Sequence, residues 1–431
     1  MKTNTVQASS VNLFDELAQK ASQPATFEAL IRLVKPRTRP GKRNLVYVLS
    51  QVNRIGQLSS ELLYLKTLYG EYYDRIIIVT GPTNSIGVNP NVFKIAGSKF
   101  IHICTDDPVI PMLGLFNTGT THGVTRLEGI DFLIVNAWGI WSLFKKSIVS
   151  GNQFASFSLP NSMRLKGEAW MKKAGMDITT PTVLLHVRDK GYMPELSHHG
   201  HRCANIENYR PAINFLEDQG YQIVRLGDQS NPPITGYSKA VIDLPFHEDY
   251  DSFLDIYFAA TCCFALNQSS GPASIVRGFS KPALMVNVSV NWDFPPATDL
   301  LMFKHYKNKI TGAELSYEQI LNLGLAELNM DEEFEKAGVI LEENTPYELE
   351  TALKEFVSIQ RGEKRLNKSI QEPFYITSQK HEKEVLEDPE QSNKHTQVFG
   401  FAHRLTNISE QFLTLNPSFL SIESEKFKEL I

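Results

Sequence analysis

The chain has 431 residues, of which 42% are hydrophobic and 21% charged, and its 43 basic and 48 acidic side chains give a formal net charge of −5. This composition excludes a disordered, collagen-like or coiled-coil chain as the main state. The weak acidity also argues against a nucleic-acid-binding protein that is basic as a whole. The length predicts two or three domains with sizeable cores.

The four cysteines show no paired spacing. Cys262 and Cys263 are neighbours in an apolar run, and no CxxC motif exists, so neither a disulfide framework nor a zinc finger is expected. Residues 1–21 lack an apolar core long enough for a secretory signal, and no run of about 18 apolar residues predicts a membrane span. The sequence therefore predicts a cytoplasmic protein with free thiols.

Residues 1–43 predict an amphipathic helix followed by a basic linker. Six positive charges lie between Arg32 and Arg43, and they suit either an anionic lipid surface or a phosphorylated acceptor. Pro36 and Pro40 discourage a lipid-binding amphipathic helix and favour a solvated linker. Peripheral contact with the inner membrane surface stays open as the alternative.

A first α/β domain is expected at residues 44–175. Leu58, Leu62 and Leu65 recur at helical spacing after the first apolar run. Strand–helix–strand order with short apolar strands predicts a parallel sheet. We expect its strands at 44–50, 75–80, 100–104 and 130–135.

The alternation of strands and helices restarts near Pro181 and predicts a second doubly wound domain at residues 176–330. Strands are expected at 182–187, 221–226, 240–244, 263–267 and 283–287, with helices at 208–219, 250–260 and 273–279. Residues 331–431 read as a helical and polar extension. Within it we expect an exposed loop at 378–397 and an apolar last segment that packs back on the body.

Several common motifs are missing. The sequence has no GxxxxGK[ST] P-loop, no GxGxxG opening either α/β unit and no GxSxG elbow, which argues against a P-loop NTPase, a dinucleotide enzyme and an α/β hydrolase. Asp106 and Asp107 form the one acidic pair near a strand end in the first half, and Pro108 after them favours a turn.

A histidine-rich stretch, SHHGHRC, holds four candidate metal ligands, His198, His199, His201 and Cys203. Adjacent residues rarely point at one ion, and no matching carboxylate or cysteine pair lies nearby, so we expect no metal. A lid over the ligand cleft is the preferred interpretation, with Arg202 and Asn205 as ligand contacts.

Ligands of open α/β sheets gather beyond the carboxyl ends of the strands, which makes the loop after the 182–187 strand a candidate site. It carries His186, Arg188 and Asp189. Arg188 offers a rigid donor fork suited to phosphate oxygens, and Asp189 could orient that arginine or accept a proton. The alternative is an Arg–Asp pair that closes the loop, with His186 as a polar core residue.

Two further loops occupy equivalent places. Arg225, Gly227 and Asp228 follow one strand and could contact a nucleotide, or they could cap the strand with a surface pair. The third loop runs from a strand into a helix, so its backbone N–H groups, hydroxyls and helix dipole suit an anion, unless a serine merely caps the helix. Its candidate residues are Gln268, Ser269, Ser270 and Gly271.

Three segments resemble a family of bacterial glycosyltransferases associated with surface polysaccharide: LLHVRDKGY, HRCANIENYRPAINFLEDQGYQIVRLGD and FALNQSSGPASIVRGFSKPALMVN. NRIGQLSSELLYL and LTLNPSFL fit the same pattern, so the likeness covers most of residues 44–420. More distantly, the His186-x-Arg188 strand end is similar to a motif of GDP-fucose-using fucosyltransferases with a GT-B fold. Asp189 stands where that motif has a second arginine, so donor identity does not carry over.

The resemblance implies a GT-B-like chain with two facing Rossmann-like domains, the second holding a nucleotide sugar and the first an acceptor. It implies a hexosyl- or deoxyhexosyltransferase that acts on a hydroxyl of a saccharide or lipid-linked saccharide, without a metal or other cofactor. Arg188 would contact the donor diphosphate together with the 269–271 turn, and Asp189 would be the general base. Asn53, Arg54 and Gln57 would face the cleft from the acceptor side.

Other functions remain open at this point. The same fold and diphosphate site would serve a nucleotide-sugar epimerase or a non-catalytic nucleotide-sugar-binding protein, and a dinucleotide oxidoreductase is a more distant alternative. The sequence names neither the sugar, the base and the acceptor nor the stereochemical course and the oligomeric state.

Overall fold

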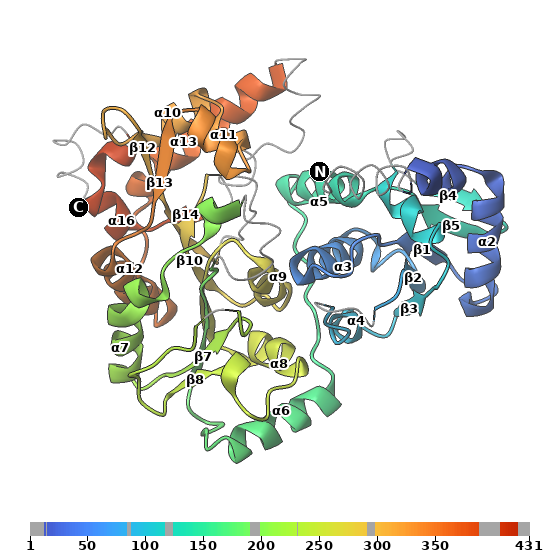
Figure 1. Cartoon of the computed structure of the whole chain (residues 1–431), viewed down its shortest axis with the longest axis horizontal. Coiled ribbons are helices and arrows are strands. Elements are labelled where there is room, and N and C mark those ends of the chain that lie inside the picture. Colours follow the sequence, from blue (N-terminus) through green and yellow to red (C-terminus); the bar gives the residue numbers. More distant parts are fainter. Residues whose placement is uncertain are drawn as a thin grey trace, which may run out of the picture. The chain divides into compact units, whose positions relative to one another are not determined.

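The computed structural model describes residues 13, 15–83, 88–116, 124–189, 199–230, 232–290, 298–387 and 406–420. Contacts within the chain divide it into two compact units, Met1–Pro160 and Asn161–Ile431. In Figure 1 the first unit runs from blue to teal and the second from green to red. Each unit is built around its own sheet.

Unit 1 contains a five-stranded sheet of order β3-β2-β1-β5-β4. Four strands run parallel, and β4 pairs antiparallel with β5. The strands are β1 (Asn44–Val48), β2 (Arg75–Thr80), β3 (Phe100–Cys104), β4 (Val124–Leu127) and β5 (Ile130–Leu133). The four strands predicted from apolar runs are confirmed, whereas the amphipathic β4 was missed because its residues are half-exposed or exposed.

Helices cover both faces of this sheet (Figure 1). On one face, Leu30 and Val34 of the N-terminal helix join Val46 and Ile77 of the central strands in a buried core. Central strands buried on both faces read as continuous apolar runs, as they do here. The helices are α2 (Pro24–Val34), α3 (Ile55–Tyr69), α4 (Val92–Ile95) and α5 (Ala137–Val149), with 3-10 turns η1 (Lys35–Arg37) and η2 (Ile110–Leu115).

Unit 2 contains a seven-stranded, fully parallel sheet of order β14-β11-β10-β9-β6-β7-β8. Its first strand is central, and the chain winds first to one side and then to the other, which is the doubly wound order. The strands are β6 (Thr182–His186), β7 (Gln222–Leu226), β8 (Val241–Asp243), β9 (Phe264–Asn267), β10 (Ala283–Val288), β11 (Leu300–Phe303) and β14 (Asn407–Ile408). A separate antiparallel pair comprises β12 (His305–Asn308) and β13 (Val339–Glu342).

Helices flank the second sheet on both faces, with α7 and α12 on one side and α8 and α9 on the other (Figure 1). The helices are α6 (Asn161–Lys173), α7 (Arg210–Asp218), α8 (Phe253–Thr261), α9 (Gly271–Gly278), α10 (Tyr317–Asn322), α11 (Asp331–Lys336), α12 (Pro346–Gln360), α13 (Lys368–Glu387) and α16 (Glu410–Leu415). Short 3-10 turns are η4 (Ile206–Tyr209), η5 (Leu244–Phe246), η6 (Leu325–Glu327) and η7 (Pro417–Leu420).

Helix α6 belongs to unit 2, although the sequence placed it in the first domain. It packs on α8, and Gly167 lies so close that a Cβ atom there would be 2.2 Å from the Tyr257 ring. The division between the units accordingly falls at Pro160, ahead of the boundary expected at residue 175.

The C-terminal third is part of the unit 2 body. The expectation of an exposed loop at 378–397 is wrong for its first half, because α13 continues to Glu387 with Ser378 and Glu382 buried; residues 388–397 lie outside the described residues. The expectation that the last segment packs back is confirmed. Strand β14 adds to the sheet edge beside β11, and Phe412 and Phe419 are buried.

The chain is therefore a mixed α/β protein with two doubly wound units, as the sequence predicts. None of the helices that the structure describes is long and apolar enough to cross a membrane.

Candidate functional site

The candidate site lies at the switch point of the unit 2 sheet. Strand β6 pairs with β7 on one side and β9 on the other, so the connections after β6 and β9 leave the sheet in opposite directions. In open α/β sheets this divergence leaves a crevice beyond the carboxyl ends of the two strands. The structure thus brings together two of the three loops singled out from the sequence, those carrying Arg188 and Gln268.

Direct hydrogen bonds join these loops. The backbone N–H of Arg188 donates to Gln268 Oε1 at 2.5 Å, and the Arg202 guanidinium donates to the Ser269 carbonyl. The backbone N–H of Ala204 donates to the Arg188 carbonyl at 2.9 Å. The residues around this junction, Arg188, Arg202, Asn267, Gln268, Ser269 and Ser270, are called the switch-point cluster below.

The switch-point cluster contains buried polar atoms without a hydrogen-bond partner in the described part of the chain. They are Arg188 Nε, both amide atoms of Asn267, Gln268 Nε2 and the Ser270 hydroxyl. Leaving such a group buried and unsatisfied costs about 1–3 kcal/mol, so native proteins normally satisfy it with a ligand or with ordered water. Most of these atoms are N–H or O–H donors, which suits an anionic ligand.

Helix α9 begins at the same place. Ser270 is its N-cap residue, but the serine side chain makes no capping hydrogen bond, and Pro272 follows in the first turn. The alternative in which this serine serves only as a side-chain cap therefore does not describe the structure. The hydroxyl and the positive end of the helix dipole both remain available to an anion.

His186 is a buried residue of the sheet. Its Nδ1 lies 3.2 Å from the Leu226 carbonyl, which can only accept, so Nδ1 carries the proton. Burial lowers the pKa of His186 to about 4, with Arg188 and Arg225 contributing in the same direction. The imidazole is consequently neutral at pH 7.

The second predicted loop follows β7, next to β6 in the sheet. Arg225 is only 2% exposed, and its Nη1 bonds both carboxylate oxygens of Asp243 on β8 at 3.0 and 2.9 Å and the Pro232 carbonyl at 3.1 Å. Asp228 follows Gly227 beyond the strand end and accepts from the Ser230 backbone N–H at 2.7 Å. Arg225 thus links β7 to β8 through the hydrogen bonds of Nη1. Asp228 lies beyond the carboxyl end of β7.

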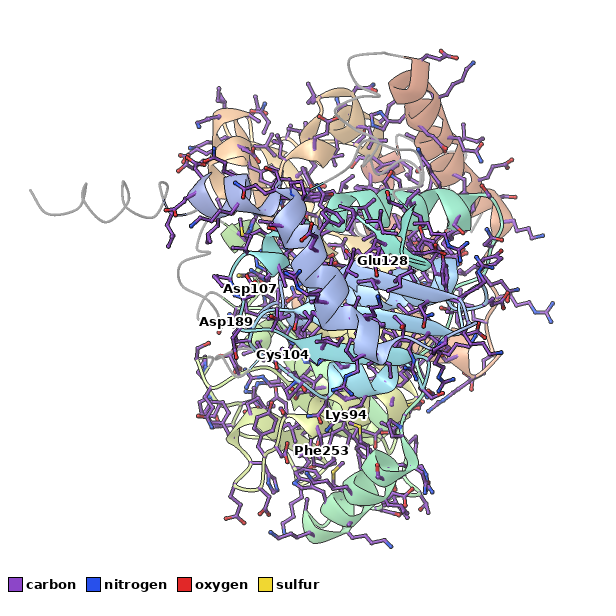
Figure 2. The ribbon with its side chains drawn as sticks, turned by 90° about the vertical axis from the view of Figure 1, so that its right-hand side faces the viewer. Lys94, Cys104, Asp107, Glu128, Asp189 and Phe253 are labelled. Carbon is purple, nitrogen blue, oxygen red and sulfur yellow. The ribbon has the colours of Figure 1, made fainter. Side chains whose placement is uncertain are left out.

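Asp189, which is labelled in Figure 2, directly follows Arg188 in the chain. Its side chain is half-buried. Residues 190–198, which include the first two residues of the predicted lid, Ser197 and His198, lie outside the described residues.

The described part of the predicted lid is hydrogen-bonded to Asp331, the first residue of α11. The backbone N–H groups of Gly200 and His201 donate to the Asp331 carboxylate at 2.9 and 2.7 Å, and His201 Nδ1 lies 2.7 Å from the same carboxylate. Burial lowers the pKa of His201 to about 4, although Asp331 opposes that shift. Asn205 accepts from the Glu207 N–H and so begins η4.

The histidines of SHHGHRC do not converge on one point in the described residues. His199 Nδ1 lies 2.8 Å from the Asn329 carbonyl, whereas His201 faces Asp331. Within the described ranges no group of three or more histidine, cysteine, aspartate or glutamate side chains is arranged to hold a metal ion.

Lys304 and the contacts of Cys203 were not expected from the sequence. Lys304 follows β11, is 2% exposed, and donates to the Cys203 carbonyl at 2.7 Å. The Arg188 side chain in turn donates a hydrogen bond to the Cys203 sulfur. The available signal was a polar residue directly after the apolar run LLMF, the same pattern that identified the other loops.

In unit 1, the predicted acceptor-side residues lie at the carboxyl end of β1. Asn53 and Arg54 are exposed, and Gln57 Nε2 donates to Glu61 Oε1 at 2.8 Å. Glu61 is buried and also accepts from the Tyr47 hydroxyl. Burial raises the pKa of Glu61 to about 7, although the hydrogen bonds from Tyr47 and Gln57 oppose the shift.

A tryptophan at the same edge of the unit 1 sheet was missed. Strands β1 and β5 are neighbours, and α5 starts just after β5 with Asn136 as its capping residue. Trp138, in the first turn of α5, is 46% exposed. An exposed tryptophan directly after an apolar strand was the signal in the sequence.

No protein-family model matches the sequence, and neither does any curated protein. Among solved structures, a glycosyl transferase of family 9 from Veillonella parvula shares 11% identity, with a TM-score of 0.36 over 61% of this chain and 86% of that one. ADP-heptose LPS heptosyltransferase II of E. coli shares 11% identity, with a TM-score of 0.36 over 60% of this chain and 90% of that one. E. coli heptosyltransferase WaaC with ADP-2-deoxy-2-fluoro heptose shares 12% identity, with a TM-score of 0.30 over 60% of this chain and 92% of that one. All three are glycosyltransferases by name, and each likeness is remote.

Proposed function

We propose that the chain is a glycosyltransferase that moves a sugar from a nucleotide-sugar donor to a hydroxyl of a saccharide or lipid-linked saccharide. One observation carries the proposal: buried donor groups without partners gather at the switch point of a parallel sheet. That is the place where open α/β sheets bind nucleotides.

The donor diphosphate binds at the switch-point cluster in this proposal. Arg188, the Gln268 amide and the Ser270 hydroxyl supply hydrogen bonds, and the N-terminus of α9 from Gly271 onward supplies its dipole. As the diphosphate departs it gains negative charge, and donors already oriented in a water-poor site can stabilise that charge by a few kcal/mol each. No metal or further cofactor takes part.

The nucleoside or sugar lies beyond β7 in this proposal. Asp228 follows the strand adjacent to the first strand, a position from which a carboxylate can accept hydrogen bonds from ribose hydroxyls. Gly227 allows close approach of the ligand to the backbone. We assign Arg225 to holding these residues in place, because its Nη1 is occupied by Asp243.

The acceptor engages unit 1 through Asn53, Arg54 and Gln57, and Asp189 accepts the proton of its hydroxyl. A general base must come within hydrogen-bond distance of the proton that it abstracts, and the carboxylate directly after the diphosphate-binding Arg188 is the candidate in this proposal. For a lipid-linked acceptor, the basic residues between Arg32 and Arg43 would contact the anionic membrane surface.

A thermal-shift panel of GDP, UDP, ADP, CMP and dTDP tests the proposal. GDP represents the fucosyltransferase-like motif, and ADP the donors named for two of the solved structures. A strong shift with one nucleotide supports a nucleotide-sugar site and names its base, whereas no shift with any of them contradicts the proposal. Isomerisation of the matching nucleotide sugar without acceptor would identify an epimerase, and binding without turnover a non-catalytic protein.

A further inference from the structure

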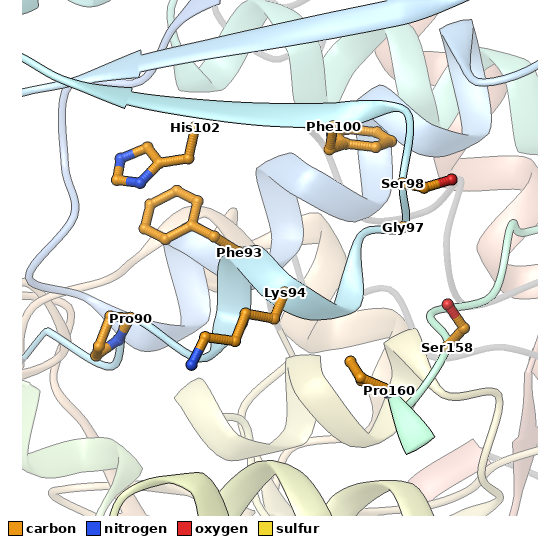
Figure 3. Close-up of a pocket in the computed structure, with 9 residues that line it drawn as sticks. All are labelled: Pro90, Phe93, Lys94, Gly97, Ser98, Phe100, His102, Ser158 and Pro160. Carbon is orange, nitrogen blue, oxygen red and sulfur yellow. The ribbon is translucent and has the colours of Figure 1, made fainter. Parts of the chain in front are cut away.

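A cavity of about 680 Å³ lies in unit 1 at a different place from the predicted acceptor-side residues. It is formed by α4, the start of β3 and the segment that ends at Pro160 (Figure 3). Its volume falls within the range of about 300–1,000 Å³ that is usual for small-molecule sites. The residues that matter for its chemistry are Phe93, Lys94, Ser98, Phe100, His102 and Ser158.

Aromatic rings form one side of the cavity. The Phe93 and His102 rings stack with centroids 3.7 Å apart and planes 5° from parallel, and Phe100 contributes a third ring. Strand β3 is at the end of the sheet order, and no described strand covers its outer side. Ring faces and edges at such an open cavity suit the C–H face of a sugar ring.

The hydrogen-bonding state of His102 follows from its neighbour. The Thr80 hydroxyl donates to the Gly81 carbonyl at 2.8 Å, so it must accept from His102 Nε2, which also lies 2.8 Å away. His102 Nε2 therefore carries the ring proton, and Nδ1 keeps its lone pair as an acceptor. Burial lowers the pKa of His102, which favours this neutral form.

One lysine, Lys94, lines the cavity, and a second, Lys66, lies next to the lining residue Gly97. Asn91 Oδ1 holds the Lys94 ammonium at 2.9 Å, and the Lys66 ammonium would be 3.6 Å from a Cβ atom on Gly97, a residue that lines the cavity. No aspartate or glutamate is among the lining residues. Within the described ranges neither lysine forms an ion pair, so both can attract an anion.

We propose that this cavity binds an acidic sugar unit of the acceptor, one that carries a phosphate or a carboxylate. The rings receive the sugar face, the hydroxyls of Ser98 and Ser158 bond its hydroxyl groups, and the lysines bind its acid. This inference rests on the proposed function. Helix α3 carries both Gln57 and Lys66, nine positions apart, which is about 13.5 Å along the helix axis at 1.5 Å per residue.

Titration calorimetry of the full chain, without nucleotide, tests the proposal directly. The probes are α-D-glucose 1-phosphate and D-glucuronate, with D-glucose and inorganic phosphate as single-feature controls. We expect both acidic sugars to bind at least tenfold more tightly than glucose or phosphate. Equal binding of phosphate and glucose 1-phosphate would show a simple anion site and overturn the proposal, as would equal binding of glucose and glucuronate.

Two substitutions then locate the binding. Lys94→Gln removes one charge from an exposed side chain and should weaken both acidic sugars about five- to tenfold. Ser158→Phe keeps the charge but fills the cavity, and it should abolish binding of both; its backbone bond to Ile95 is retained. Lys146→Gln, on the exposed surface of α5, is the matched control and should change nothing.

Nucleotide-induced thermal shifts, measured on the same variants, separate the two proposals. They should be unchanged, because the switch-point cluster is in unit 2. Sugar binding that survives both Lys94→Gln and Ser158→Phe overturns the cavity proposal and leaves the nucleotide site standing. Sugar binding that Lys94→Gln weakens and Ser158→Phe abolishes, in a chain that no nucleotide stabilises, supports the acidic-sugar site and contradicts the proposed transferase.

Discussion

Gln268 joins two loops that are separated by 80 residues in the chain. Its Oε1 accepts from the Arg188 backbone, which orients the amide, and the opposite Nε2 is buried without a partner in the described residues. An amide held in this way presents a donor whose direction does not depend on the ligand. Such preorganisation avoids the cost of ordering a side chain when the diphosphate arrives.

Arg188→Ala should weaken nucleotide binding about 10- to 100-fold, because a hydrogen bond to a charged group is worth about 1.5–3 kcal/mol. The variant should stay folded, since the side chain is only half-buried. Calorimetry with the nucleotide found in the panel measures the effect. Arg164→Ala, in an exposed ion pair on α6, is the matched control. Undiminished affinity in the Arg188 variant would remove this arginine from the site.

Gln268→Glu separates the two ends of that side chain. The carboxylate still accepts from the Arg188 backbone, but it replaces the Nε2 donor by a negative charge facing the diphosphate. We expect nucleotide binding to fall by more than tenfold, and the melting temperature in the absence of ligand to fall as well, because Gln268 is fully buried and a carboxylate there must be desolvated. A variant that binds as tightly as the wild type would place the diphosphate elsewhere.

Glu61 makes the stability of unit 1 depend on pH. Its folded pKa of about 7 lies above the ordinary 4.5, so the native state holds the proton more tightly than the unfolded state does. This stabilisation is complete below pH 4.5 and is lost as the pH rises through 7, by at most about 3 kcal/mol at 1.36 kcal/mol per pKa unit. In Glu61→Gln the melting temperature should depend less on pH between pH 5 and 8, and it should be higher than that of the wild type at pH 8. An equal fall of the melting temperature between pH 5 and 8 in the variant and the wild type would contradict this role of Glu61.

At the scale of elements, the apolar strands could be predicted closely and the amphipathic or very short ones could not. The run Arg75–Thr80 is a strand over the expected residues because buried parallel strands are continuously apolar. Strand β14 has two residues, too few for any period, and it forms only because β11 offers an edge. Helix α13 reads as polar because much of its surface faces solvent.

Gly167→Ala tests the packing of α6 on α8. In an exposed helix interior this change would stabilise by about 0.5–1 kcal/mol. Here the added methyl group meets the Tyr257 ring, and overpacking typically costs about 1–3 kcal/mol. We therefore expect a lower melting temperature, by calorimetry, and little change for Leu165→Ala on the exposed side of the same helix. Stabilisation by Gly167→Ala would show that α6 does not pack as described.

At the scale of the molecule, each unit repeats one plan: a first strand at the centre, two strands added to one side and later strands to the other. All the donor-side residues named in the proposal are in the second unit. A fragment of residues 161–431 should therefore fold and show the nucleotide shift of the full chain, while transfer is lost. Circular dichroism and the same thermal panel check this. An unfolded fragment would mean that the second unit depends on the first.

The candidate site could be found from the sequence only in part. Parallel strands place their carboxyl ends on one edge, so Arg188 and the 268–271 turn could be grouped without coordinates. The hydrogen-bond partners of each side chain could not be predicted from the sequence. Arg225 binds Asp243 on a neighbouring strand, and Asp331 holds His201 from 130 residues away. Such pairings depend on tertiary packing, which no local pattern records.

The parallel strand β14 has a consequence for synthesis of the chain. Until residues 407 and 408 have emerged from the ribosome, the outer side of β11 has no strand neighbour among the described residues, and an uncovered strand of that kind invites pairing with other chains. The first unit meanwhile has all of its own strands by residue 133. The nascent protein therefore carries a finished lobe and an unfinished one for most of translation, and premature termination before position 406 should yield aggregates.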